Sequence, residues 1–114
     1  MPRPALLVVA IPHVCASALA SYLRQRGVYD VYAPDVGAGE GVPGRRFDAV
    51  VTTVPVPEAV GDVVIELPQT FDRPVTVSVN DVTFPVTVSE SHPIEDVAGL
   101  LHRYVINGER PALA

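Results

Sequence analysis

Four side chains with useful chemistry stand at or just beyond the ends of apolar runs. His13 and Cys15 follow the run of residues 5–11, and Thr52 and Thr53 fall near the end of the run that begins at Phe47. In an open sheet of parallel strands, ligands bind in the crevice outside the carboxyl ends of the strands. We therefore predict that His13, Thr52 and Thr53 line such a crevice. The ordinary alternatives are a partly exposed turn histidine and strand-end threonines with satisfied hydroxyl groups.

Cys15 is the only cysteine, which excludes an internal disulfide. A single cysteine among small helical residues is typical of a buried core thiol, so we expect Cys15 to be buried. No Cys/His spacing resembles a zinc site, and Asp30, Asp35 and Asp48 do not cluster in the sequence. These patterns predict no metal site and no catalytic pair of carboxylates.

All eight basic residues are arginine. Without lysine, the chain can have neither the phosphate-binding lysine of a P-loop nor a Schiff-base lysine. The net charge is −5 and the arginines are scattered, which argues against nucleic-acid binding by this chain itself. The sequence therefore excludes several classes of phosphoryl-transfer and DNA-binding site.

The chain has 114 residues, of which 48% are apolar and 18% charged, as expected for one globular domain. No apolar run approaches the roughly 20 residues that span a bilayer, and the first residues do not resemble a signal peptide. We therefore expect a cytoplasmic protein with no membrane contact.

Predicted strands and predicted helices alternate along the chain. The unbroken apolar run 5–11 predicts a strand buried on both faces, and 28–33 and 47–54 predict further strands. Residues 14–26 predict a helix that ends at Gly27. Its expected core-facing stripe comprises Val14, Ala18, Leu19, Tyr22 and Leu23.

The second half is predicted to contain a hairpin and a final helix. Residues 74–89 predict two strands joined at Asn80-Asp81, with Pro85 at an edge. Pro93 predicts the start of a helix that ends at Gly108, with His92 as its cap and His102 half-buried. Residues 58–67 are ambiguous, because apolar side chains fall on one helical face while Val63-Val64-Ile65 is β-branched. The length needed for a parallel crossover favours a helix there.

This alternation predicts an α/β fold with a mostly parallel sheet and an antiparallel edge hairpin. Residues 1–107 form the expected domain, and residues 108–114 the expected linker or frayed tail.

Three segments, in this order and spacing, resemble the receiver domain of bacterial response regulators that precede a LuxR-type helix-turn-helix. They are Leu6–His13 with the helix ending at Arg26-Gly27, Phe47–Glu58, and Ser91–Leu101 with Asn107–Arg110. The resemblance implies a three-layer sandwich of the flavodoxin-like or CheY-like type. It also implies a homodimer that contacts DNA only through a separate domain.

The departures from that family remove its chemistry. The family's Mg²⁺-binding acidic pair is replaced by Ala10 and Ile11, and its phosphoacceptor aspartate by Thr53. The position of the lysine that contacts the phosphoryl group matches Ser89 or its neighbour. Transfer of a phosphoryl group to aspartate needs a carboxylate nucleophile and a divalent cation.

We therefore predict a non-catalytic pseudo-receiver that has no cofactor and acts by homodimerisation or by sensing a small-molecule ligand. His13, Thr52, Thr53 and Ser89 are its candidate ligand-binding residues.

A second resemblance leads to a different function. Phosphotransferase-system IIB domains also place a strand before a helix and carry a phosphorylated cysteine directly after the strand. Here Cys15 lies four residues beyond Ile11, and the Gly-rich phosphate loop is absent. The alternative is therefore a small phosphocarrier or enzyme that uses Cys15 or His13.

Overall fold

The computed structural model describes residues 3–10, 13–35, 38–39, 41, 46–53, 60–68, 73–89 and 91–110, apart from the side chains of His13 and Val60. The elements, in chain order, are β1 (Ala5–Val9), α1 (His13–Arg26), β2 (Asp30–Tyr32), β3 (Arg46–Thr52), β4 (Val60–Glu66), β5 (Val75–Val79), β6 (Val82–Val86), α2 (Pro93–Leu101) and the π-helical turn η2 (His102–Ile106).

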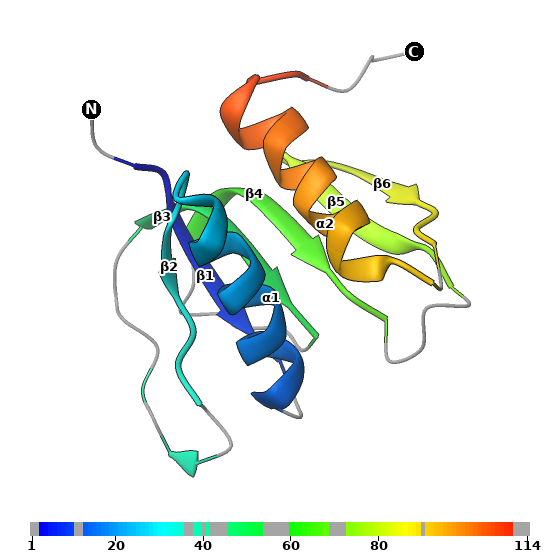
Figure 1. The fold of residues 1–114 in the computed structure, drawn as a ribbon. Helices are drawn as coiled ribbons and strands as arrows, with labels where there is room; N and C mark the ends of the chain where they lie inside the picture. The colour runs from blue at the N-terminus through cyan, green and yellow to red at the C-terminus, as the bar shows by residue number, and fades with distance from the viewer. Residues whose placement is uncertain are drawn as a thin grey trace.

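The six strands form one sheet in the order β2-β1-β3-β4-β5-β6 (Figure 1). The pairs β1–β2, β1–β3 and β3–β4 are parallel, and the pairs β4–β5 and β5–β6 are antiparallel. The expected α/β fold, with a mostly parallel sheet and an antiparallel hairpin at one edge, is confirmed.

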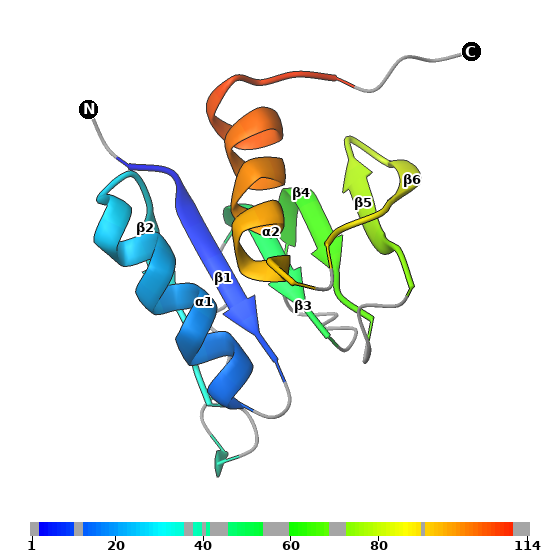
Figure 2. The ribbon, with the colours of Figure 1, turned by 45° about the vertical axis from the view of Figure 1, so that its right-hand side comes forward.

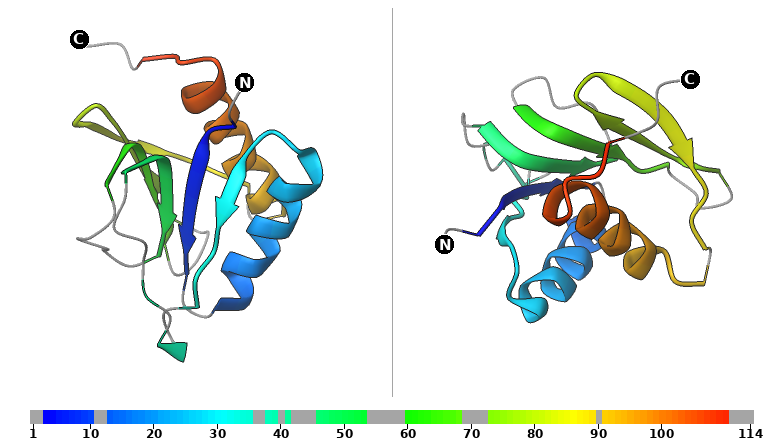
Figure 3. Two further views of the ribbon diagram at one scale, coloured as in Figure 1. Left: turned by 90° about the vertical axis from the view of Figure 1, so that its left-hand side faces the viewer. Right: turned by 90° about the horizontal axis from the view of Figure 1, so that it is seen from above.

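Both helices lie on the same face of this sheet, side by side (Figures 2 and 3). The described residues therefore form two layers, one of strands and one of helices. A helical layer on the opposite face, as the three-layer sandwich requires, is not found among the described residues.

Successive residues of β1 are buried on opposite faces of the sheet. Leu6 and Val8 belong to the large core beneath the helices, whereas Leu7 and Val9 pack with Phe47 and Val50 on the other face. All five residues of β1 are buried. Burial on both faces explains why the sequence of this strand shows no apolar–polar alternation.

The hairpin has the predicted register. Val79 pairs with Val82, Val77 with Phe84 and Val75 with Val86. Asn80 and Asp81 have φ values of 49° and 71°, the positive values that a two-residue hairpin turn of type I′ requires.

In the same hairpin, Ser78 of β5 lies opposite Thr83 of β6, and their hydroxyl oxygens are 2.8 Å apart. Pro85 lies in the edge strand β6, as its missing N–H demands. The hairpin prediction is confirmed.

The helix expected at 58–67 is wrong, because β4 occupies residues 60–66. Here the β-branched residues prevail over the helical spacing: Val63 and Ile65 are buried beneath the helices, and Val64 packs on the opposite face. The crossover argument failed because it assumed a helical connection out of β3, whereas only residues 53–59 separate β3 from β4.

The core-facing stripe of α1 also differs from the prediction. Ala16, Leu19, Ala20 and Leu23 are buried, whereas Val14 is 68% exposed and Ala18 is exposed. The small side chains of Ala16 and Ala20 let the helix approach the sheet closely, so alanine, and not the larger valine, faces the core. The predicted end of the helix is correct, since Gly27 has a φ of 70° and donates its N–H to the Arg24 carbonyl.

The final helix begins at Pro93 as predicted, and Gly108 follows it with a φ of 66°. His92 occupies the N-cap position but makes no side-chain capping bond. The half-buried position expected for His102 is wrong, because this residue is exposed at the start of η2. Its backbone N–H is shared between the carbonyls of Ala98 and Gly99.

Candidate functional site

The carboxyl ends of β1, β3 and β4 lie at one edge of the sheet because these three strands are parallel. Beyond β1, Ala10 is 4% exposed and α1 begins at His13. The structure therefore provides the expected edge, and the chain turns from β1 into α1 there. Ile11 and the side chain of His13 lie outside the described residues, so their predicted roles stay predictions.

A groove opens between the two helices at this edge, with a volume of about 290 Å³. Val8 and Ala10 of the β1 segment line it, and Cys15 contributes the only sulfur atom. The other contributors are apolar: Val14, Ala18, Leu19, Leu67, Pro93, Ile94 and Val97. We call this cavity the α1–α2 groove.

Cys15 is exposed and lines the α1–α2 groove, so the expectation of a buried core thiol is wrong. The reason is the rotation of α1 described above: Ala16 and Leu19 face the core, which turns Cys15 toward the space between the helices. The side of the helix that sequence reasoning assigned to the core therefore forms one wall of a cavity.

Thr52 and Thr53 are held in the sheet and do not appear in the lining of the groove. Thr52 is 2% exposed, and its carbonyl accepts a hydrogen bond from the Leu67 N–H at 2.8 Å. The Thr53 N–H donates to the Val9 carbonyl at 3.1 Å. Their backbones thus tie β3 to both neighbouring strands at the carboxyl edge.

Ser89 lies in the turn that leads into α2. Its hydroxyl oxygen accepts hydrogen bonds from the backbone N–H groups of Ser91 and His92, at 3.1 and 3.3 Å. Its own N–H donates to Asp96 Oδ2 of α2 at 2.6 Å. Ser89 thereby fixes the entry to the helix, the structural role of a polar residue ahead of a helix N-terminus.

The structure does not bring Ser89 together with Thr53. Ser89 follows β6, and β6 is three strand positions from β3 in the sheet. At about 4.8 Å per strand, β3 and β6 are roughly 14 Å apart within the sheet. Ser89 therefore follows a strand that is separated from the strand of Thr52 and Thr53 by β4 and β5.

A second cavity, which sequence reasoning missed, lies between the C-terminal half of α1 and the middle of α2. Its volume is about 450 Å³, and its polar groups come from Tyr22, Arg26, Tyr29, Glu95 and His102. We call it the Arg26 cleft. Tyr22 and Arg26 are four residues apart, so they lie on the same side of a helix. That spacing is the sequence signal for this pair, and Tyr22 also packs against the core, as its place in the predicted stripe implies.

Two groups of the Arg26 cleft have shifted pKa values. A hydrogen bond from Arg26 to the Tyr22 hydroxyl raises the pKa of Arg26, and the negative charge of Glu95 acts in the same direction. Burial raises the pKa of Tyr29, while the charge of Arg26 opposes that shift. Arg26 is therefore a cation and Tyr29 a neutral phenol at neutral pH.

Within the described ranges, no group of three or more His, Cys, Asp or Glu side chains could hold a metal ion. No helix in the described part of the chain has both the length and the apolar character needed to cross a membrane.

Comparison of the chain with protein-family models, with curated proteins and with solved structures found no significant match.

Proposed function

We propose that this domain is a non-catalytic regulatory module, a degenerate receiver that senses an apolar small molecule instead of accepting a phosphoryl group. The strand order supports the resemblance, because flavodoxin-like sheets have the order 2-1-3-4-5 and this sheet begins β2-β1-β3-β4 with all four strands parallel. The proposal implies a cytoplasmic protein and, on the opposite face of the sheet, a third layer of the flavodoxin-like type.

The observation that carries the proposal is the apolar character of the α1–α2 groove. It lies outside the carboxyl end of β1, where ligands of open α/β sheets bind, and Ala10 forms part of its wall. A phosphoryl group or Mg²⁺ would lose its hydration there without gaining a counter-charge from the described lining residues. An apolar ligand would instead bury its surface against both helices.

The phosphoryl part of the proposal is tested with a small phosphodonor. After incubation with acetyl phosphate and Mg²⁺, intact-mass spectrometry should show the unmodified mass. A mass increase of one phosphoryl group, lost on Thr53→Ala substitution, would contradict it.

The ligand part is tested with N-phenyl-1-naphthylamine, an uncharged and apolar fluorescent probe. Ala18→Trp should fill the groove and weaken probe binding by at least tenfold. Gln25→Trp is the matched control, because Gln25 is exposed on the same helix and does not line the groove. Equal probe binding by both variants would overturn the assignment of the groove.

Homodimerisation is the second part of the proposal, with DNA contacted only by a separate domain. The apolar side of α2 is already packed within the molecule, where Tyr104 of η2 meets Phe84 edge-to-face at 5.7 Å. The surface left for a two-fold contact at the hairpin is the free edge of β6.

A thiol-dependent phosphocarrier is the second candidate function, and the exposure of Cys15 favours it. A cysteine buried in the core could not accept a phosphoryl group, whereas this thiol faces an open groove. The test is a mass increase after treatment with phosphohistidine-type or phosphoramidate donors that disappears in Cys15→Ser. The apolar lining disfavours it, since the described lining residues bring no positive charge to the thiol.

A further inference from the structure

The Arg26 cleft carries opposite charges on its two walls. Arg26 comes from α1, and Glu95 comes from α2. In the described part of the chain, Arg26 and Glu95 make no ion pair within 4.0 Å. The negative charge of Glu95 nevertheless raises the pKa of Arg26. Because the two charged side chains line one cavity without forming an ion pair, each of them is available to a ligand that carries both charges.

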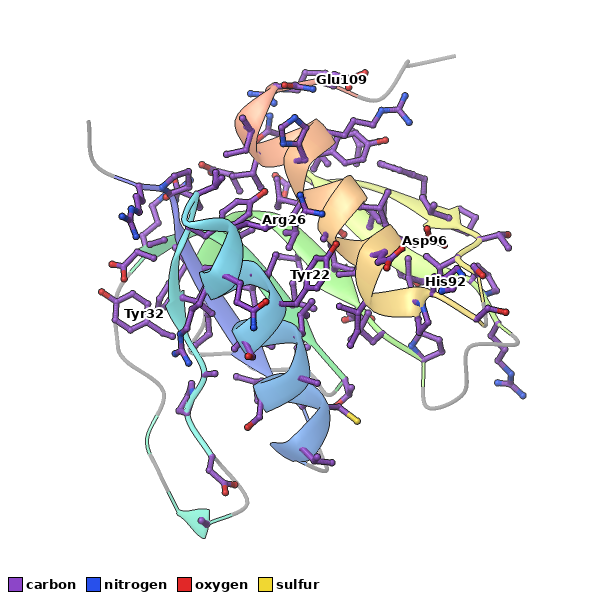
Figure 4. The ribbon with its side chains drawn as sticks, viewed as in Figure 1. Tyr22, Arg26, Tyr32, His92, Asp96 and Glu109 are labelled. Carbon is purple, nitrogen blue, oxygen red and sulfur yellow. The ribbon has the colours of Figure 1, made fainter. Side chains whose placement is uncertain are left out.

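Tyr22 holds the guanidinium of Arg26 in a defined position. Arg26 Nη2 donates to the Tyr22 hydroxyl at 2.6 Å, and the guanidinium carbon lies 4.9 Å from the centre of the same ring (Figure 4). One of the five N–H donors is thereby used, and the planar fork remains able to bind a carboxylate with two parallel hydrogen bonds. An ordered arginine loses less side-chain entropy when it binds such a group.

Gly99 keeps the α2 wall open. A Cβ atom at this position would meet nothing within 4 Å, so no packing inside the molecule requires glycine here. Glycine within a helix costs about 1 kcal/mol relative to alanine. The helix also changes to π geometry at His102, on the same wall, and short π segments occur often at functional sites.

Apolar groups line the space between the two charges. Leu23 and Ala98 are buried there, and Val28 is 38% exposed beside the half-buried ring of Tyr22. The cavity of about 450 Å³ falls within the usual range for small-molecule sites, roughly 300–1,000 Å³.

We propose that the Arg26 cleft binds a free α-amino acid with an apolar or aromatic side chain. The ligand carboxylate pairs with Arg26, the ligand ammonium pairs with Glu95, and the side chain covers Leu23, Val28 and Ala98. Binding is reversible and involves no chemical step. This site is separate from the α1–α2 groove, so the inference goes beyond the proposed function and does not depend on it.

The first test compares three related probes by isothermal titration calorimetry. L-Phenylalanine carries both charges, 3-phenylpropionate lacks the ammonium, and 2-phenylethylamine lacks the carboxylate. We expect L-phenylalanine to bind at least tenfold more tightly than either of the others. Equal affinity for 3-phenylpropionate would overturn the zwitterion assignment, and so would the absence of binding by all three probes.

Variants locate the binding. Arg26→Gln and Gly99→Leu should each weaken L-phenylalanine binding by at least tenfold, the first by removing the cation and the second by filling the space. Arg73→Gln is the control for loss of one positive charge, because Arg73 is exposed just before β5 and does not line the cleft.

The two sites are told apart with the groove variant. Ala18→Trp should leave L-phenylalanine binding unchanged, even though it blocks the fluorescent probe. Loss of phenylalanine binding in Ala18→Trp, with binding retained in Gly99→Leu, would place the amino acid in the α1–α2 groove and overturn the inference.

Discussion

Gly61 and Gly99 have opposite surroundings, and this difference predicts opposite effects of the same substitution. A Cβ at Gly61 would lie 3.1 Å from Val50 Cγ2 and 3.2 Å from the Phe47 carbonyl oxygen, and the latter is backbone that cannot rotate away. A Cβ at Gly99 meets nothing. We expect Gly61→Ala to lower the free energy of unfolding by about 1–2 kcal/mol through overpacking. Gly99→Ala should raise it by about 0.5–1 kcal/mol.

Urea unfolding of both variants beside the wild type provides the measurement. A destabilised Gly99→Ala would mean that the wall of the Arg26 cleft is closed. An unchanged Gly61→Ala would mean that β3 and β4 are further apart at this point.

Val77 tests the burial of the hairpin. Its side chain is fully buried, so Val77→Asp would place an uncompensated carboxylate in the core. We expect the free energy of unfolding to fall by about 4 kcal/mol, a large share of the roughly 5–15 kcal/mol that stabilises a typical domain.

Circular dichroism during thermal unfolding measures the effect of Val77→Asp. Thr87→Asp is the control, because Thr87 is exposed just beyond β6. If both variants melt like the wild type, the apolar face of β5 does not face the core.

Individual site residues were harder to predict than the edge at which they lie. The α1–α2 groove lies at the edge where the sequence predicted a crevice, but Ser89 fixes the entry to α2 and Thr52 is buried within the sheet. A single cysteine among small helical residues predicted a buried thiol, whereas Tyr22 packs against the core as expected and also lines the Arg26 cleft. Apolar spacing along α1 fits two overlapping stripes. Only the close approach of Ala16 and Ala20 to the sheet decides which stripe is buried.

At the scale of elements, the backbone conformation of the hairpin turn predicts which substitutions at Asp81 stabilise the domain. Asp81 has a φ of 71°, which costs a residue with a side chain about 1 kcal/mol and costs glycine much less. Asp81→Gly creates an Asn-Gly turn and should raise the melting temperature. Asp81→Val should lower it, since a β-branched side chain resists positive φ.

Differential scanning calorimetry of the wild type and these two turn variants measures the three melting temperatures directly. A melting temperature of Asp81→Gly below that of the wild type, or a melting temperature of Asp81→Val equal to it, would show that the turn has a different conformation.

Elements with strong local signals were predictable, and those set by the neighbouring strands were not. The hairpin could be read from its two-residue turn and its paired valines, and α2 from Pro93 and its apolar stripe. In contrast, residues 53–59 alone separate β4 from β3, and the strand conformation of β4 is fixed by pairing with β3 and β5 on either side. The β-branched run Val63-Val64-Ile65 is the local trace of that pairing, but the helical spacing of the apolar residues around it indicates the opposite conformation.

For the whole molecule, the parallel pairing of the first strands followed from the sequence, but the layers did not. Alternating elements predicted a parallel sheet, yet the connections after β2 and β3 fall largely outside the described residues, and the described helices cover one face. The alternation of strands and helices therefore predicts the parallel pairing, but it does not fix which face of the six-stranded sheet each helix covers.

The free edge of β6 determines how two copies of the chain could associate. In a hairpin with a two-residue turn, the closing pair Val79–Val82 is hydrogen-bonded, so Phe84 and Val86 also point their backbone groups toward β5. The backbone groups of Thr83, Pro85 and Thr87 therefore point outward. Pro85 offers a carbonyl but no N–H, which blunts the edge.

This geometry yields a quantitative prediction for the proposed homodimer. An antiparallel two-fold pairing of β6 centred on Phe84 would place Thr83 of each copy opposite Pro85 of the other. Two of the four bonds of these pairs lack a donor, and Pro85→Thr supplies both. At about 1 kcal/mol for each hydrogen bond, the dimer Kd should fall by roughly 30-fold.

Sedimentation velocity from micromolar to millimolar concentration measures this change. We expect the wild type to show concentration-dependent dimerisation, Pro85→Thr to dimerise at lower concentration, and Thr83→Pro to dimerise at higher concentration, because it removes the two remaining outward donors. The Thr83 N–H points away from β5, so its loss removes no hydrogen bond of the hairpin ladder. A monomer at every concentration for all three proteins would remove homodimerisation from the proposed function. A dimer whose Kd is the same in all three would move its interface away from β6.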